Sequence, residues 1–192
     1  MWTVNFLIYV FITAYTPGPN NLLSFGNAGT YGFRKSVPML MGLLVSFLIL
    51  MTLCAVATSF FNDILPQVMP YLTVVGAVYI LWLALQLARS EPPKEAEVGR
   101  VCTFWQAFFL NCLNVKVIVY GLTSYATFVL PYTTERLSLI AAAIFLSVMG
   151  SSANCLWAYA GNALRSVFEK HCKAVNCTLA LLLIYSVATM FI

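Results

Sequence analysis

Long runs of apolar residues, separated by short polar segments, recur along the whole chain. The runs cover residues 3–26, 37–60, 70–89, 103–130, 138–160 and 174–192. Each run is near the ~20 residues that an α-helix needs to cross about 30 Å of hydrocarbon. The pattern therefore predicts six transmembrane helices and leaves little chain for a soluble domain.

The composition agrees with this pattern. Of the 192 residues, 61% are hydrophobic and only 8% are charged, whereas soluble domains carry about 25% charged residues. The residues before the first apolar run lack the basic region of a cleavable signal peptide, so we expect this run to remain as a transmembrane helix. The predicted fold class is an all-α polytopic membrane protein.

Basic residues are concentrated in alternate connections between the predicted helices. The first, third and fifth connections hold eight of the ten Lys and Arg residues, namely Arg34, Lys35, Arg89, Lys94, Arg100, Arg165, Lys170 and Lys173. Connections rich in Lys and Arg face the cytoplasm. We therefore expect both termini to be periplasmic, and the net charge of +4 to concern membrane topology rather than nucleic acid.

The segment Thr16–Asn21 interrupts the first apolar run with two prolines and a glycine. Pro17 and Pro19 have no N–H, so the carbonyls of Thr13 and Tyr15 lose their helical donors. An unpaired backbone group in hydrocarbon costs several kcal/mol, so such a break is expected to face protein or a polar cavity. A broken helix at this depth is typical of the binding site of a secondary transporter.

A polar segment over residues 91–102 separates two halves, residues 1–90 and 103–192, with three predicted helices each. Because three is an odd number, two corresponding halves must be inverted with respect to the membrane, as in many secondary transporters. The partner of the first break should then lie in the fourth helix. The polar segment Asn111–Lys116 interrupts that run, so the fourth helix is a second candidate for a break.

Lys116 lies about a dozen residues into the fourth apolar run. A charge at such a depth costs ~2.5–3.5 kcal/mol on insertion scales, so it should face a cavity or a partner. No Asp or Glu lies inside any predicted span, which makes Lys116 the candidate proton-coupling group. The alternative is a structural charge that is hydrogen-bonded to carbonyls of neighbouring helices.

The first break offers groups that match both ends of an amino acid. The first N–H groups of the helix that follows it favour a carboxylate, and the freed carbonyls before it favour an ammonium group. The predicted substrate-binding residues are Thr13, Tyr15, Pro17, Gly18, Pro19, Asn20, Asn21, Asn114 and Lys116. The alternative is that the break only kinks a packed helix and that the asparagines join helices to one another.

Several segments resemble the lysine-exporter (LysE/RhtB) superfamily, in particular its homoserine/threonine-resistance branch of amino-acid exporters. They are Thr16–Asn21, Gly32–Lys35, Gly42, Gly76–Ile80 and Asn114–Lys116. The likeness covers essentially the whole chain and is greatest to the exporters of cysteine and O-acetylserine. It implies export driven by the proton gradient. Many members have Asn-Pro-Lys in the fourth helix, and because Val115 replaces the proline here we expect a less sharp break.

These observations predict a secondary transporter that exports small amino acids, such as cysteine or O-acetylserine, across a bacterial inner membrane by proton antiport. Its expected partners are the amino acid, protons and the lipid bilayer, and a homo-oligomer is left open. No nucleic acid, cofactor, metal or enzymatic activity is expected. Two alternatives remain, a membrane thiol-redox protein that uses Cys54 and Cys155, and a metal-ion exporter.

Overall fold

The computed structural model describes residues 3–61, 64–89 and 101–188, and its regular elements are helical throughout. The elements are α1 (Val4–Tyr15), α2 (Pro19–Tyr31), α3 (Phe33–Phe61), α4 (Leu65–Arg89), α5 (Phe104–Cys112), α6 (Val115–Thr123), the π-helix η2 (Ser124–Val129), α7 (Arg136–Ala163) and α8 (Arg165–Ala188). By length and composition, α3, α4 and α7 can each cross a membrane. The predicted all-α polytopic membrane fold is confirmed. Most of the predicted linker, residues 91–100, lies outside the described residues.

The first predicted transmembrane helix is broken at the Pro-Gly-Pro segment, as expected. Helices α1 and α2 have 12 and 13 residues, which at about 1.5 Å per residue makes them ~18 and ~20 Å long. Thr16 and Gly18 between them have extended backbone angles. Each helix is too short to cross the bilayer alone, so the extended segment between them lies within the membrane.

The fourth predicted helix is broken as well. Helix α5 and the helical segment from α6 to η2 are bent by 57° relative to one another. Asn114 is extended between them, and its side chain caps α6 by accepting a hydrogen bond from the Lys116 N–H at 3.1 Å. An asparagine cap can start a helix without proline. The expectation of a weaker break at Val115 did not take this cap into account.

Helix α8 begins earlier than predicted. It starts at Arg165 rather than near residue 174, and His171 inside it has non-helical angles (φ −130°, ψ 36°). His171 is exposed. The apolar part of α8 therefore follows a kink, and the basic residues before residue 174 belong to a helical segment rather than to a loop.

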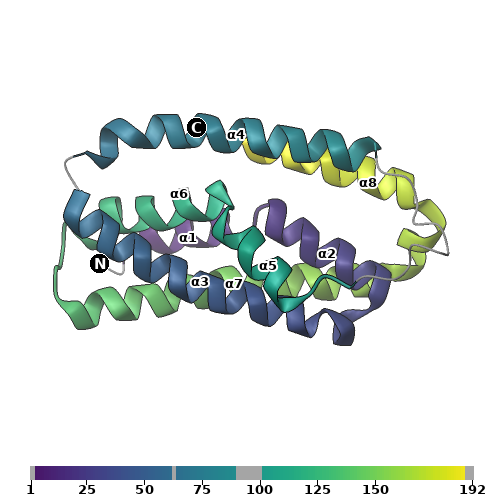
Figure 1. Cartoon of the computed structure of the whole chain (residues 1–192), viewed down its shortest axis with the longest axis horizontal. Coiled ribbons are helices and arrows are strands. Elements are labelled where there is room, and N and C mark those ends of the chain that lie inside the picture. The colour runs from purple at the N-terminus through teal and green to yellow at the C-terminus, as the bar shows by residue number, and fades with distance from the viewer. Residues whose placement is uncertain (1–2, 62–63, 90–100, 189–192) are drawn as a thin grey trace.

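The two broken helices lie between pairs of long helices. Helix α3 packs against α7, and α4 packs against α8. Helix α2 contacts α7 and α8, while α6 contacts α3 and α4, so that α1, α2, α5 and α6 occupy the middle of the bundle (Figure 1). The ends of α1 and α5 and the beginnings of α2 and α6 consequently meet inside the protein.

One end of the bundle carries basic side chains. The connections from α2 to α3 and from α7 to α8 lie there, at the end opposite the N-terminus (Figure 1). Arg34 and Lys35, at the beginning of α3, and Arg89, the last residue of α4, are exposed. The turn between α2 and α3 requires Gly32, whose φ of 88° strains any residue with a Cβ.

Hydrogen bonds from side chains hold the helices together at this basic end. Asn27 in α2 donates to the Ser36 Oγ at 2.8 Å and accepts from the Cys102 N–H at 3.0 Å. Asn162 in α7 accepts from the Phe33 N–H at 3.0 Å. These bonds join α2, the beginning of α3, the segment before α5 and the end of α7.

Candidate functional site

The two breaks contact each other through Lys116, which lies in the first turn of α6. Its Nζ donates to the carbonyl of Pro17 at 2.9 Å and to both the carbonyl and the Oγ1 of Thr16 at 3.1 Å. We call these three oxygens the oxygen cage. An ammonium group has three N–H donors and no acceptor, so the cage satisfies it fully without a carboxylate.

The last carbonyls of α1 already have side-chain donors. Thr13 accepts from the Thr16 Oγ1 (3.2 Å), Ala14 from the Asn21 Nδ2 (2.9 Å) and Tyr15 from the Trp157 Nε1 (3.1 Å). The carbonyls of Thr13 and Tyr15 therefore each accept one side-chain hydrogen bond, and their second lone pair remains for the predicted ligand. Sequence spacing identified which helical donors are lost, but it could not show that the side chains of Thr16 in the break and of Trp157 in α7 replace them.

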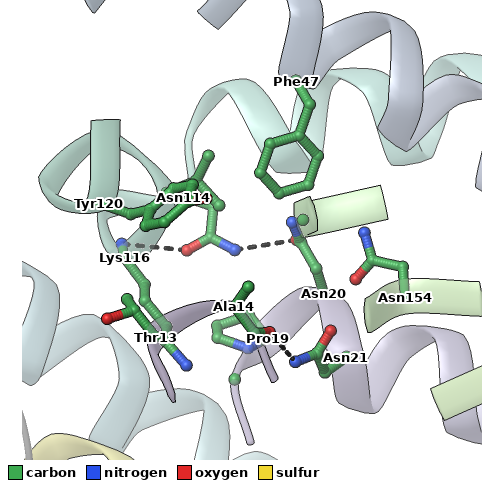
Figure 2. A pocket seen from close by; sticks show the side chains of 13 residues that line it. Thr13, Ala14, Pro19, Asn20, Asn21, Phe47, Asn114, Lys116, Tyr120 and Asn154 are labelled. Atoms are coloured by element: carbon green, nitrogen blue, oxygen red, sulfur yellow. Dashed lines mark hydrogen bonds between the residues drawn. The ribbon is translucent and has the colours of Figure 1, made fainter. Parts of the chain in front are cut away.

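Buried amides connect both breaks to α3. Asn20 donates to the Asn111 Oδ1 and accepts from the Asn114 Nδ2 at 2.9 Å, the latter bond being drawn in Figure 2. Asn111 in turn donates to the Ser46 Oγ at 2.6 Å. Asn111 and Ser46 were not in the predicted site. The position of Asn111 three residues before Asn114 could have indicated it, whereas nothing in the sequence around Ser46 does.

A pocket lies between the breaks, with about 360 Å³ of space between protein atoms, including its open mouth. Its lining consists of Thr13, Ala14, Gly18, Pro19, Asn20, Asn21, Phe47, Asn114, Lys116, Val117, Tyr120, Gly150 and Asn154 (Figure 2). Seven of the nine predicted site residues are in this lining, and Tyr15 and Pro17 are not. The lining contains one positive side chain, Lys116, and no acidic residue.

Asn154 of α7 lines this pocket with an unused hydrogen-bond donor. The residue is only 2% exposed, and its Nδ2 has no hydrogen-bond partner within the part of the chain that the structure describes. Figure 2 shows its amide beside Asn20 and Asn21. Since buried polar groups are normally paired, this donor is a candidate contact for a bound molecule. Asn154 was outside the predicted set, although an asparagine within an apolar run was a visible signal.

The beginning of α2 offers further donors to the pocket. Gly18 precedes the helix and makes no side-chain cap, and Pro19 occupies its first position. The first backbone bond of the helix runs from the Leu22 N–H to the Gly18 carbonyl at 2.9 Å. The N–H groups of Asn20 and Asn21 therefore have no acceptor within the helix, and such an N-terminus favours a carboxylate.

Gly18 leaves the space that the Lys116 side chain fills. A Cβ at position 18 would lie 2.9 Å from both the Cδ and the Nζ of Lys116. We expect Gly18→Ala to preserve the fold and displace the lysine from the oxygen cage, because the clashing atoms are the end of a flexible side chain. Reaction with an amine-specific reagent, followed by mass spectrometry, should label Lys116 faster in this variant than in the parent protein.

Gly26→Ala is the matched control for this labelling, because a Cβ at position 26 meets no atom within 4 Å. It should leave the reactivity of Lys116 unchanged. Equal labelling of Lys116 in the parent protein and in Gly18→Ala would show that Gly18 does not hold the lysine in place.

The cysteines were the basis of the alternative predictions. Cys54 is buried, with its Sγ 4.0 Å from the Ile118 carbonyl, whereas Cys155 is exposed, and both are free thiols. Within residues 3–61, 64–89 and 101–188 no group of three or more His, Cys, Asp or Glu side chains could hold a metal ion. No observation favours the thiol-redox or the metal-export alternative.

A polar pocket between two broken helices of an apolar bundle is an arrangement typical of membrane transporters. Residues 11–192 match the model of the LysE type translocator family. The chain belongs to this family, as its sequence motifs predicted, and it is a transporter rather than an enzyme.

Full-length relatives are named for efflux. The chain is 39% identical over 186 residues to a "Cysteine/O-acetylserine efflux protein" of Escherichia coli O139:H28, a match that covers 97% of this chain and 95% of the relative. It is 38% identical, with the same coverage, to proteins of that name from Escherichia coli K12 and Shigella sonnei. No solved structure matches the chain.

Proposed function

We propose that the protein exports small amino acids, above all cysteine and O-acetylserine, from the cytoplasm across the inner membrane of a bacterium. The observation that carries this proposal is 38–39% identity to cysteine/O-acetylserine efflux proteins over 97% of the chain. The pocket supports it, because both broken helices and α7 line it, with one positive side chain and the amides of Asn20, Asn21, Asn114 and Asn154.

The pocket and the break beside it hold groups that suit the two ends of an α-amino acid. The free N–H groups at the beginning of α2 and the unpaired Nδ2 of Asn154 suit the carboxylate. The oxygens of Thr16 and Pro17 that now hold the Lys116 ammonium suit an ammonium group. These groups belong to the first broken helix and to α7, so movement of the two helices relative to one another would release the substrate.

We further propose proton antiport with Lys116 as the proton-coupling group. It is the one charged residue of the pocket lining, and the predicted spans hold no Asp or Glu that could take this role. Intramembrane charges in transporters commonly belong to the ion pathway. The same geometry fits the alternative in which Lys116 only joins the two breaks, so a variant at this position has to decide between them.

The helix packing supports two inverted halves, residues 1–90 and 103–192. If the halves correspond, α2 matches α6, α3 matches α7 and α4 matches α8. The observed contacts α3–α7 and α4–α8 then each join matching helices. The contact of α2 with α8 predicts a contact of α6 with α4, which is also present. The basic end then faces the cytoplasm by the positive-inside rule. This orientation places both termini in the periplasm.

Efflux from proteoliposomes tests the proposed function. Vesicles that contain the purified protein are loaded with labelled cysteine, O-acetylserine, threonine or lysine, and efflux is timed with and without an imposed pH gradient. We expect cysteine and O-acetylserine to leave fastest and the gradient to accelerate them. Efflux no faster than from protein-free vesicles would contradict amino-acid export, and efflux that ignores the gradient would contradict proton antiport.

Asn154 and Asn111 should respond differently to the same substitution. Asn154→Leu removes a donor without a protein partner, so the melting temperature should hold while cysteine affinity falls about tenfold, or ~1.4 kcal/mol. Asn111→Leu breaks the bonds to Asn20 and Ser46 and should cost about 2 kcal/mol of stability. Thermal unfolding and equilibrium binding measure both. A loss of stability in Asn154→Leu with unchanged binding would contradict a substrate contact.

A further inference from the structure

We propose that the oxygen cage holds one ammonium group at a time, and that Lys116 and the α-ammonium of the exported amino acid occupy it alternately. The inference rests on the proposed function, in which the pocket takes an amino acid. It makes Lys116 an internal competitor of the substrate rather than a contact that remains beside it.

The cage is fully used by a single ammonium. All three oxygens lie within 2.9–3.1 Å of the Lys116 Nζ, which matches the three donors of that group. A second ammonium in the same place would find the three oxygens already occupied and would be repelled by the like charge of Lys116. No acidic residue in the pocket lining would neutralise this second positive charge. Binding of one cation therefore requires departure of the other.

Each of the last carbonyls of α1 already accepts one hydrogen bond from a side chain, as does the Thr16 carbonyl of the cage, from the Asn21 Nδ2 at 2.9 Å. Thr13, Ala14 and Tyr15 all have side-chain donors, from Thr16, Asn21 and Trp157. The cage is also next to the groups that suit a carboxylate, because only Gly18 separates Pro17 from the beginning of α2. In an α-amino acid a single carbon joins the ammonium and the carboxylate, so neighbouring groups of the chain can receive both.

Mutual exclusion at the cage couples substrate to protons when Lys116 leaves the cage as the neutral amine. The amino acid enters the cage after Lys116 has given a proton to the cytoplasm and left as the neutral amine. When the amino acid has left on the outer side, Lys116 takes a proton from the periplasm and returns to the Thr16 and Pro17 oxygens. Each cycle then moves one amino acid outward and one proton inward, with no acidic side chain in the path.

Rescue of a shortened lysine tests the proposal. Lys116→Ala removes Cγ, Cδ, Cε and Nζ, which together correspond to n-propylammonium. In the purified variant, n-propylammonium chloride should raise the melting temperature, and 1-propanol should not. Cysteine at ten times its own dissociation constant should raise the apparent dissociation constant of n-propylammonium about tenfold, as expected for two ligands that exclude one another.

Lys173→Ala is the matched control, because Lys173 is an exposed lysine of α8 and its variant should not respond to n-propylammonium. If Lys116→Ala does not fold, Gly18→Ala offers a second test, since its Cβ displaces the lysine. Methylammonium should then stabilise this variant in competition with cysteine, whereas the parent protein should not respond.

Two results would overturn the proposal. One is an absence of stabilisation by n-propylammonium, and the other is binding of n-propylammonium that cysteine does not weaken although cysteine itself binds. Failure of the proposed function is a separate result. In that case the parent protein would not export cysteine or O-acetylserine from proteoliposomes. Stabilisation of Lys116→Ala by n-propylammonium would still show whether the cage binds an ammonium group.

Discussion

Lys116→Met is expected to abolish proton-driven export while the chain still folds. Methionine is unbranched and one atom shorter than lysine, and it removes the charge that contacts Thr16 and Pro17. Truncating one partner of a buried, hydrogen-bonded charge costs 2–5 kcal/mol in measured interfaces, and a loss of about 3 kcal/mol corresponds to a ~100-fold slower gradient-driven efflux. Efflux from proteoliposomes with an imposed pH gradient measures it.

Lys173→Met provides the control, because it removes an exposed lysine of α8 and should leave efflux unchanged. The two roles of Lys116 give different results. A proton-coupling lysine predicts that downhill amino-acid exchange survives in Lys116→Met and that the response to the pH gradient disappears. If Lys116 only joins the two breaks, less of the Lys116→Met variant should fold, but the folded fraction should still export faster when the pH gradient is imposed.

Gly161→Ala is expected to produce the largest loss of stability. A Cβ at position 161 would lie 2.9 Å from the Cα of Phe25 and closer still to its carbonyl group. Because the obstacle is the backbone of α2, neither side can move without separating α2 from α7. Overpacking usually costs 1–3 kcal/mol, and we expect about 3 kcal/mol here. The melting temperature of the purified protein in detergent measures the effect.

The same glycine contact influences the site. Phe25 packs edge-on against Trp157 with ring centroids 6.2 Å apart, and Trp157 holds the Tyr15 carbonyl at the break. Gly161→Ala should therefore also weaken cysteine binding in the protein that folds. Gly26→Ala is the control, since a Cβ there meets nothing within 4 Å and alanine favours the helix. Equal melting temperatures for the two variants would contradict the close contact of α2 with α7.

The break in the first helix could be predicted because its cause is local. Pro17 and Pro19 lack an N–H wherever they are placed, so the loss of helical hydrogen bonds does not depend on the rest of the fold. The same holds for the apolar runs that became α3 and α7. At the fourth helix the local cause was the capping side chain of Asn114, which is visible in the sequence but less conspicuous than a proline.

The partners of the exposed backbone groups could not be predicted. Trp157 and Tyr15 are 142 residues apart, and Lys116 and Thr16 are 100 apart. Such contacts depend on how α7 and α6 pack against the first break. The sequence predicted Lys116 as a substrate-binding and proton-coupling residue, whereas the packing places its ammonium on the oxygens of Thr16 and Pro17, which follow the Thr13 and Tyr15 carbonyls expected to hold the substrate ammonium. Asn154 was visible in the sequence as an asparagine within an apolar run, but its unpaired amide and its position in the pocket lining depend on the packing of α7.

The central claim is that the pocket between the two breaks is the amino-acid site, and a structure determined with bound L-cysteine tests it most directly. We predict density for the amino acid beside Asn154 and the beginning of α2, with its ammonium at the Thr16 and Pro17 oxygens and Lys116 displaced. Cysteine bound elsewhere, with the Lys116 Nζ still on those oxygens, would contradict the account.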